Sequence, residues 1–172
     1  NKAYIEQMAA IYNVINFEEE SLASLEFKLQ QNLLTKSSEY INLANFYLYK
    51  RLPIDSSKVV EKGLTLNVLD NNITNNELIS NAYIVAKDFK NALRALIDVT
   101  KLSDDPKYDY RIGQIYLQNS EYSDAIKYLK IARDKGWKSK PGSLELLIGI
   151  CFIELDDFDS ARVELSKAST LG

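Results

Sequence analysis

The stretch from Ile112 to Ala125, IGQIYLQNSEYSDA, decides the fold of this chain. Gly113 is followed three residues later by Tyr116, and Tyr116 is followed nine residues later by Ala125. The same order of small residue, aromatic residue and alanine occurs twice more, at Ser80, Tyr83 and Ala92 and at Gly149, Phe152 and Ala161. The alanines are 33 residues apart (Ala92 to Ala125) and 36 residues apart (Ala125 to Ala161). Three copies of one spacing indicate an internal repeat.

Each copy predicts a pair of packed helices. Small residues on facing helices allow their backbones to approach closely, and the aromatic side chains fill the space beside that contact. No segment alternates between apolar and polar residues for long enough to predict a strand. The spacing therefore predicts an all-α array of about five helix pairs, with short polar turns between the two helices of a pair.

This pattern resembles the tetratricopeptide repeat, although the family's initial Trp and terminal Pro are absent. The resemblance implies a right-handed α-α superhelix over residues 1–172 as a single domain. Two further copies fit upstream, at Ala44 with Tyr47 and at Ala9 with Tyr12. Their second helices fit less well, because Ser21 and Ser56 or Ser57 replace the alanine, and the segment 52–54 is expected to shift the register. The expected repeats are 2–36, 37–72, 73–105, 106–141 and 142–172.

Local signals predict where several helices begin and end. Asp105 before Pro106 predicts an N-cap with proline in the first turn. Thr74 with Glu77 three residues later predicts a capping box. Gly136 predicts a left-handed helix end, and the segment 140–142 is expected to start the next helix.

Composition excludes several classes of function. The chain has 172 residues, a net charge of −3, no His and one Cys. A mildly acidic chain does not suit nucleic-acid binding, which needs a concentrated basic surface. The lack of His removes the commonest catalytic base, and Cys151 has apolar neighbours that favour a buried structural role. We therefore expect no enzyme activity, no metal site and no cofactor.

Neither a membrane-spanning segment nor a signal peptide is visible in the sequence. The longest apolar stretch, 146–153, is far shorter than the roughly 20 residues that cross a bilayer. The chain begins at Asn1 and not at Met, which favours a fragment of a longer protein.

The resemblance also implies a concave groove lined by the first helix of each repeat. The residue after each small packing residue points into this groove in the family. Those residues are here Ala10, Asn45, Asn81, Gln114 and Ile150. Asn45, Asn81 and Gln114 could form a ladder of amides that binds the backbone of an extended peptide. Alternatively, they only solvate an exposed surface.

Lys107 and Arg111 lie four residues apart and share one face of a predicted helix. They occupy the places where chaperone-binding relatives carry a Lys and an Arg of a carboxylate clamp, and Asn45 also matches that clamp. Ile41 and Leu78 replace the family's Lys and Asn, so the clamp is incomplete. The alternative is a solvated basic pair.

A narrower resemblance covers residues 92–172. Segments such as 101–105, 134–136 and 141–149 are similar to bacterial tetratricopeptide proteins encoded beside TonB–ExbB–ExbD energy-transduction genes. That resemblance implies a periplasmic location, with the cytoplasm as the alternative.

We therefore expect a non-catalytic scaffold that binds a protein or peptide, and the alternative is a structural self-association module. Val163 and Leu171 on the last predicted helix have no later helix to cover them. This predicts an exposed apolar strip and a weak homodimer through the C-terminal helix.

Overall fold

The computed structural model describes residues 22–139 and 142–171, and these residues form helices and no strand. They belong to two compact units, Asn1–Asn71 and Asn72–Gly172, which we describe separately. The first unit contains a helical segment at 22–30 and the helices α2 (Ser37–Tyr49) and α3 (Pro53–Thr65). The second contains α4 (Ile73–Val85), α5 (Phe89–Thr100), α6 (Pro106–Gln118), α7 (Tyr122–Asp134), α8 (Ser143–Glu154) and α9 (Phe158–Leu171).

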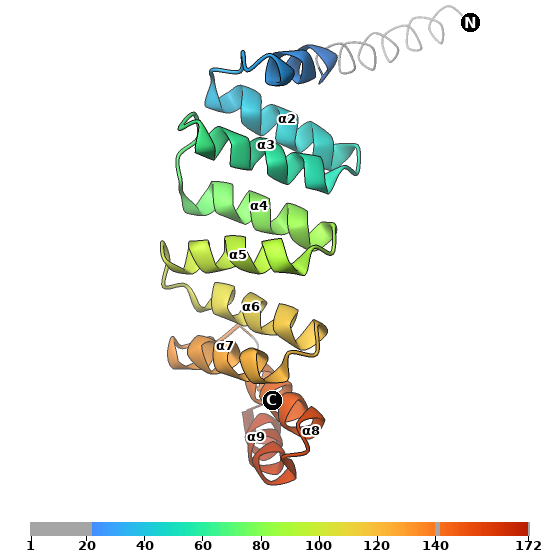
Figure 1. Ribbon diagram of the computed structural model, residues 1–172. Coiled ribbons are helices and arrows are strands. Elements are labelled where there is room, and N and C mark those ends of the chain that lie inside the picture. The colour runs from blue at the N-terminus through green and yellow to red at the C-terminus, as the bar shows by residue number, and fades with distance from the viewer. Residues whose placement is uncertain (1–21, 140–141, 172) are drawn as a thin grey trace, which may run out of the picture. The chain divides into compact units, whose positions relative to one another are not determined.

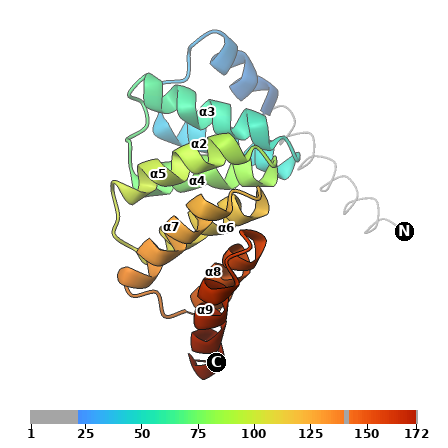
Figure 2. The ribbon, with the colours of Figure 1, turned by 60° about the horizontal axis from the view of Figure 1, so that its bottom comes forward.

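The second unit is a row of helix pairs (Figures 1 and 2). Helices α4 and α5 pack together, as do α6 and α7, and α8 and α9. Successive pairs are joined by packing of α5 against α6 and of α7 against α8. One core cluster links Leu129 of α7 with Ile148 and Cys151 of α8. The stacking of each pair on the next thus buries side chains that one pair alone would leave exposed.

The small residues of the repeat lie where the helices of a pair approach most closely. Ala92 and Ala125 are fully buried and Ala161 is nearly so. A Cβ atom added to Gly113 would lie 2.7 Å from Cγ of Leu129, and one added to Gly149 would lie 2.7 Å from Cδ2 of Leu165. The predicted close contacts are therefore confirmed.

The turn inside each pair has one repeated geometry. Its second residue has a positive φ between 58° and 61° in all four described pairs, at Arg51, Lys87, Ser120 and Asp156. The next residue donates its backbone N–H to the carbonyl of the repeat's aromatic residue, at 2.7–2.9 Å, in Tyr47, Tyr83, Tyr116 and Phe152. These bonds are of the Schellman type and satisfy carbonyls at the helix end. They also explain the constant interval between the aromatic residue and the following alanine.

The expected register shift in the second repeat is wrong. Helix α3 begins four residues after α2 ends, as α5 does after α4, and Pro53 is accommodated in its first turn. Ser56 takes the place of the alanine and is fully buried, as is Ser57, whose hydroxyl donates to the carbonyl of Ile54 at 2.8 Å. Serine is small enough to permit the same close approach. The residues Ala9, Ala10, Tyr12 and Ser21 of the first expected repeat lie outside the described residues.

The helix ends confirm two of the three local signals that can be tested. The carboxylate of Asp105 accepts the N–H of Lys107 at 2.9 Å and caps α6. Gly136 has a φ of 84° and follows Lys135, the C-cap residue of α7. The capping box at Thr74 is wrong, because α4 begins two residues earlier than a cap at Thr74 requires, and Asn72 is its cap, accepting from the N–H of Asn75. Asn72 precedes Thr74 in the chain and its side chain accepts the N–H of Asn75, so the helix begins before Thr74 and includes it. Residues 140 and 141 lie outside the described part.

The last helix exposes the residues expected from the sequence and one more. Val163 and Leu171 are each 53% exposed, as predicted. Phe158, at the start of the same helix, is 63% exposed as well. Its place at the start of α9 faces outward, where no described helix follows.

Candidate functional site

Helices α4 and α6 meet in a polar contact made by two of the predicted groove residues. Asn81 follows the buried Ser80 on α4, and Arg111 precedes the buried pair Ile112 and Gly113 on α6. The guanidinium of Arg111 donates from Nη2 to Oδ1 of Asn81 at 2.7 Å. Because the contact joins residues 30 positions apart, it places both side chains on one surface, which we call the first-helix surface.

Lys107 lies on the same surface with an acidic partner. Its Nζ is 3.4 Å from Oε1 of Glu77 on α4, and the hydroxyl of Tyr108 donates to the same oxygen at 2.8 Å. The Tyr108 hydroxyl, and then the charge of Glu77, raise the pKa of the Lys107 ammonium above its ordinary value. Lys107 and Arg111 each have a polar partner on α4, Glu77 for Lys107 and Asn81 for Arg111.

Gln114 lies one helical turn beyond Arg111 and on the same side of α6, because residues three apart are neighbours on a helix surface. Its side chain is half-buried, whereas that of Asn81 is exposed. On α8 the equivalent residue is the half-buried Ile150. The first-helix surface of this unit is thus polar on α4 and α6 and apolar at that position on α8.

Asn45 belongs to the other compact unit and is described with it. It is exposed on α2 and lines an open cavity of about 330 Å³ together with Asn42, Phe46 and Tyr49. This cavity offers amide groups beside aromatic rings. The continuous ladder from Asn45 through Asn81 to Gln114 stays a prediction.

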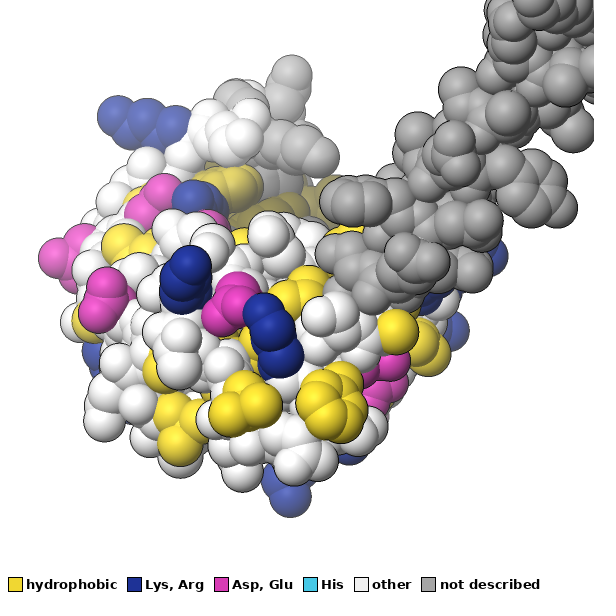
Figure 3. Space-filling model, turned by 90° about the horizontal axis from the view of Figure 1, so that it is seen from above, with side chains coloured by type: hydrophobic (Ala, Val, Ile, Leu, Met, Phe, Trp, Pro, Cys, Tyr) yellow, Lys and Arg dark blue, Asp and Glu magenta, His cyan; other side chains and the backbone are white. Residues whose placement is uncertain are grey.

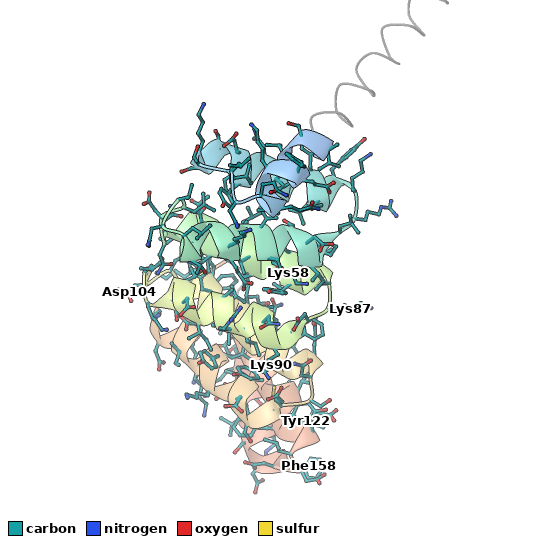
Figure 4. All side chains as sticks on the ribbon, turned by 45° about the horizontal axis from the view of Figure 1, so that its top comes forward. Lys58, Lys87, Lys90, Asp104, Tyr122 and Phe158 are labelled. Atoms are coloured by element: carbon teal, nitrogen blue, oxygen red, sulfur yellow. The ribbon has the colours of Figure 1, made fainter. Side chains whose placement is uncertain are left out.

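A larger cavity of about 610 Å³ lies in the second unit, away from the first-helix surface. Leu93, Arg94 and Ile97 of α5 line it, with Tyr116 and Asn119 at the end of α6. Lys90 of α5, labelled in Figure 4, also lines it. Sequence reasoning missed this cavity, because it depends on the separation between α5 and the turn that follows α6.

Among the described residues, the single thiol lies in the core. Cys151 is fully buried, and this burial raises the pKa of its thiol to about 11, so the reactive thiolate is scarce near neutral pH. The described residues include no cluster of side chains suited to a metal ion. In the same part of the chain, every helix is too short or too polar to cross a membrane.

Charges of both signs are mixed on the face of the molecule in Figure 3. Lys and Arg side chains there lie among Asp and Glu and among hydrophobic side chains. On that face the positive charge is not gathered into one patch.

No protein-family model and no curated protein sequence matches this chain. Solved structures do. The chain is similar to MamA, with a TM-score of 0.65 and 17% identity over 92% of this chain and 90% of that one. MamA from Desulfovibrio magneticus RS-1 gives a TM-score of 0.63 and 16% identity over 96% and 92%. YrrB, described as a TPR protein with an unusual peptide-binding site, gives 0.66 and 16% over 94% and 81%.

These likenesses establish the fold. The predicted class, an all-α helical repeat of the tetratricopeptide type, is confirmed. At such low sequence identity they carry no site and no partner across to this chain.

Proposed function

We propose that this chain is a non-catalytic scaffold whose first-helix surface binds an extended peptide or protein segment. The hydrogen bond between Arg111 and Asn81 is the observation that carries this proposal. It shows that polar side chains of successive first helices, α4 and α6, meet on one accessible surface. The described peptide-binding site of YrrB, a protein of the same fold, supports the same use of the fold.

The chemistry of this surface suits a peptide backbone. An amide side chain both donates and accepts hydrogen bonds, so it matches the N–H and C=O groups of an extended strand whatever its sequence. Asn81 already accepts a hydrogen bond from Arg111 through Oδ1. This bond fixes the orientation of the Asn81 side-chain NH₂ group. Gln114 adds a second amide on the same side of α6.

Apolar side chains set the expected sequence preference of the peptide. Ile150 replaces the amide at the equivalent position of α8, and the partly buried Leu147 beside it packs against the core cluster of α7 and α8. A peptide segment that lies along α6 and reaches α8 is expected to bind most tightly when it is polar at one end and apolar at the other. The predicted partner is therefore a segment with one or two large apolar residues.

Binding of an acidic group by Lys107 and Arg111 is a weaker use of the same surface. Glu77 stands 3.4 Å from the Lys107 amine, so an incoming carboxylate has to displace or share this partner. Because Ile41 and Leu78 replace the polar residues of the chaperone-tail clamp, this chain is not proposed as a chaperone-tail receptor.

A display selection with random linear peptides tests the proposal on the full chain. Recovered peptides are titrated against the parent and against Asn81→Ala combined with Gln114→Ala. Loss of two backbone hydrogen bonds is expected to weaken binding roughly tenfold or more. The thermal midpoint is expected to change little, since the Asn81 side chain is exposed and that of Gln114 is only half-buried.

Lys127→Ala is the matched control, because Lys127 is exposed on the second helix α7. It is expected to bind each peptide as the parent does. Peptides that bind the double variant unchanged, or that lose binding with Lys127→Ala, contradict this site.

A bacterial envelope setting extends the proposal. The similarity of segments 101–105, 134–136 and 141–149 to repeats encoded beside TonB–ExbB–ExbD genes supports it, with the periplasm as the compartment. Crosslinking in the source organism, followed by fractionation, tests this part separately. Recovery of the chain from the cytoplasm without envelope proteins overturns the setting and leaves the peptide site intact.

A further inference from the structure

The cavity of about 610 Å³ beside α5 lies on a second helix and away from the first-helix surface, and we call it the α5 groove. Residues of α5 form one wall, among them Lys90, which Figure 4 labels. Tyr116, Asn119 and Glu121, from the end of α6 and the turn after it, form the other wall. Helix α5 packs against α4 and α6, and α6 packs against α5 and α7. The groove is thus formed by helices that have described neighbours on both sides.

The floor of the α5 groove comes from the repeat itself. Tyr116 is the motif aromatic of its pair, is half-buried, and stacks on Tyr128 of α7 with 5.6 Å between the ring centroids. A smaller cavity, of about 320 Å³, lies one pair further along and is lined by Phe152, the motif aromatic of the next pair. Because the repeat makes an aromatic-lined groove in both places, the groove by itself indicates no particular partner.

The charges that line the α5 groove have an excess of positive sign. Lys90, Arg94 and Lys101 lie four and seven residues apart and follow one side of α5. The carboxylates that line the groove are those of Asp98 and Glu121. Asp98 is held by Lys101, with 2.6 Å between Oδ1 and Nζ. Three cations against two carboxylates form a basic wall in a chain whose net charge is −3.

The repeat does not require this basic wall. On α7, 33 residues later, the places of the two lysines are taken by Ser123 and Asp134. The smaller groove has the opposite balance, since Lys130 is its lining cation and Asp159 and Glu164 are its lining carboxylates. The basic wall is therefore a feature of α5 and not of the motif, and it favours a partner with acidic groups.

The spacing along α5 suits an extended segment. Lys90 and Arg94 are about 6 Å apart along the helix axis, at a rise of about 1.5 Å per residue. Residues two positions apart in an extended chain are about 6.6 Å apart and point to the same side, so carboxylates at alternate positions can meet both cations. Ile97 follows about 4.5 Å further along the helix. It lines the groove with Leu93 and Tyr116, so a large apolar side chain of the segment can lie there.

We propose that the α5 groove binds an acidic protein segment in extended form, with two carboxylates at alternate positions followed by a large apolar residue. A protein segment is favoured over nucleic acid because two carboxylates also line the groove, whereas nucleic-acid binding needs a concentrated basic surface. The site does not rest on the peptide site of α4 and α6, and one chain can hold a different segment at each.

Three short peptides with blocked ends probe the groove. They are SESEFSG, its basic counterpart SKSKFSG, and SESESSG, which lacks the aromatic residue. Fluorescence anisotropy follows each labelled peptide as the full chain is added, in about 50 mM salt so that charge interactions are weakly screened. SESEFSG is expected to bind with a Kd below about 1 mM, and the other two more weakly. Added salt is expected to weaken the binding of SESEFSG.

Charge reversal on α5 gives a gain of binding that unfolding cannot produce. Lys90→Glu combined with Arg94→Glu changes two exposed residues and is expected to weaken SESEFSG binding roughly tenfold or more. The same variant is expected to bind SKSKFSG more tightly than the parent does. Lys127→Glu combined with Lys138→Glu is the matched control, since it changes the net charge equally at exposed positions outside the groove. Circular dichroism checks that each variant keeps its helices.

A second pair of variants separates the groove from the first-helix surface. Lys107→Ala combined with Arg111→Ala is expected to bind SESEFSG as the parent does, and so is Asn81→Ala combined with Gln114→Ala. Loss of SESEFSG binding in either of these variants overturns the proposal, as does a parent that binds the acidic and basic peptides equally or binds neither. An oligothymidine strand that displaces SESEFSG and binds more tightly also overturns it and assigns the basic wall to nucleic acid.

Discussion

The pairs α6–α7 and α8–α9 share one sequence pattern at an interval of 36 residues, yet they differ in what surrounds them. Leu129 is fully buried, while its equivalent Leu165 is half-buried. Each leucine packs over a glycine of its own pair, Gly113 or Gly149. The difference comes from α8, which covers α7, whereas no described helix covers α9. The repeat motif thus encodes the pair, and the neighbouring pair determines how strongly each residue is held.

Truncation of these two leucines is expected to show the largest difference. Leu129→Ala leaves a cavity in a closed core and is expected to cost about 2–5 kcal/mol of unfolding free energy. Leu165→Ala removes a side chain that is partly in water, and the expected cost is below about 1.5 kcal/mol. Urea unfolding followed by circular dichroism measures both. Equal costs would mean that α9 is covered in solution.

Addition of one methyl group to the two glycines gives a smaller and sharper test. In both cases the new Cβ atom is expected to press on the leucine of the partner helix. Gly113→Ala is expected to destabilise by roughly 1–2 kcal/mol, because Leu129 is enclosed and overpacking outweighs the helix-forming advantage of alanine.

Gly149→Ala is expected to be nearly neutral, since Leu165 lines an open cavity and can move outward into it. Thermal unfolding of the two variants beside the parent measures the difference. A Gly149→Ala variant as damaged as Gly113→Ala contradicts the proposed freedom of Leu165.

Substitutions in the turns are expected to give the smallest change in stability. Unlike the changes above, this change is stabilising. Ser120 has a φ of 60° and Asp156 a φ of 58°, although one turn lies in the covered pair and the other in the last pair. Ser120→Gly relieves the left-handed conformation and is expected to stabilise by about 0.5–1 kcal/mol. Asp156→Gly is expected to gain less, because Asp tolerates this conformation better than Ser. Thermal midpoints that fall in both variants would show that the side chains matter more than the backbone.

Much of the fold could be predicted because the repeat depends on local size and spacing. Residue type alone predicted the close contacts of Gly113, Gly149 and the three alanines. The turn residues Arg51, Lys87, Ser120 and Asp156 carried no signal of positive φ, since none is glycine. Their common position two residues after each first helix was the only clue. Asn72 displaced Thr74 as the cap of α4 because two capping residues stood close together in the sequence.

The candidate site could be predicted only in part. Lys107 and Arg111 were placed on one face by their spacing of four. Their partners Glu77 and Asn81 come from another helix about 30 residues away, and only the packing of α4 beside α6 brings them together. The exposure of Phe158 follows from the lack of a described neighbour and not from its own motif. Contacts between pairs therefore lie beyond what a single repeat can show.

Hydrogen exchange of the full chain with a display-selected peptide tests most directly whether the peptide lies on the first-helix surface. Backbone amides in α4 and α6 are expected to exchange more slowly when the peptide is bound, while those in α5 and α7 are expected to stay unchanged. The α8–α9 pair is expected to respond to the peptide only near Ile150. Protection of α5 and α7 without protection of α4 and α6 would show that the peptide binds another surface.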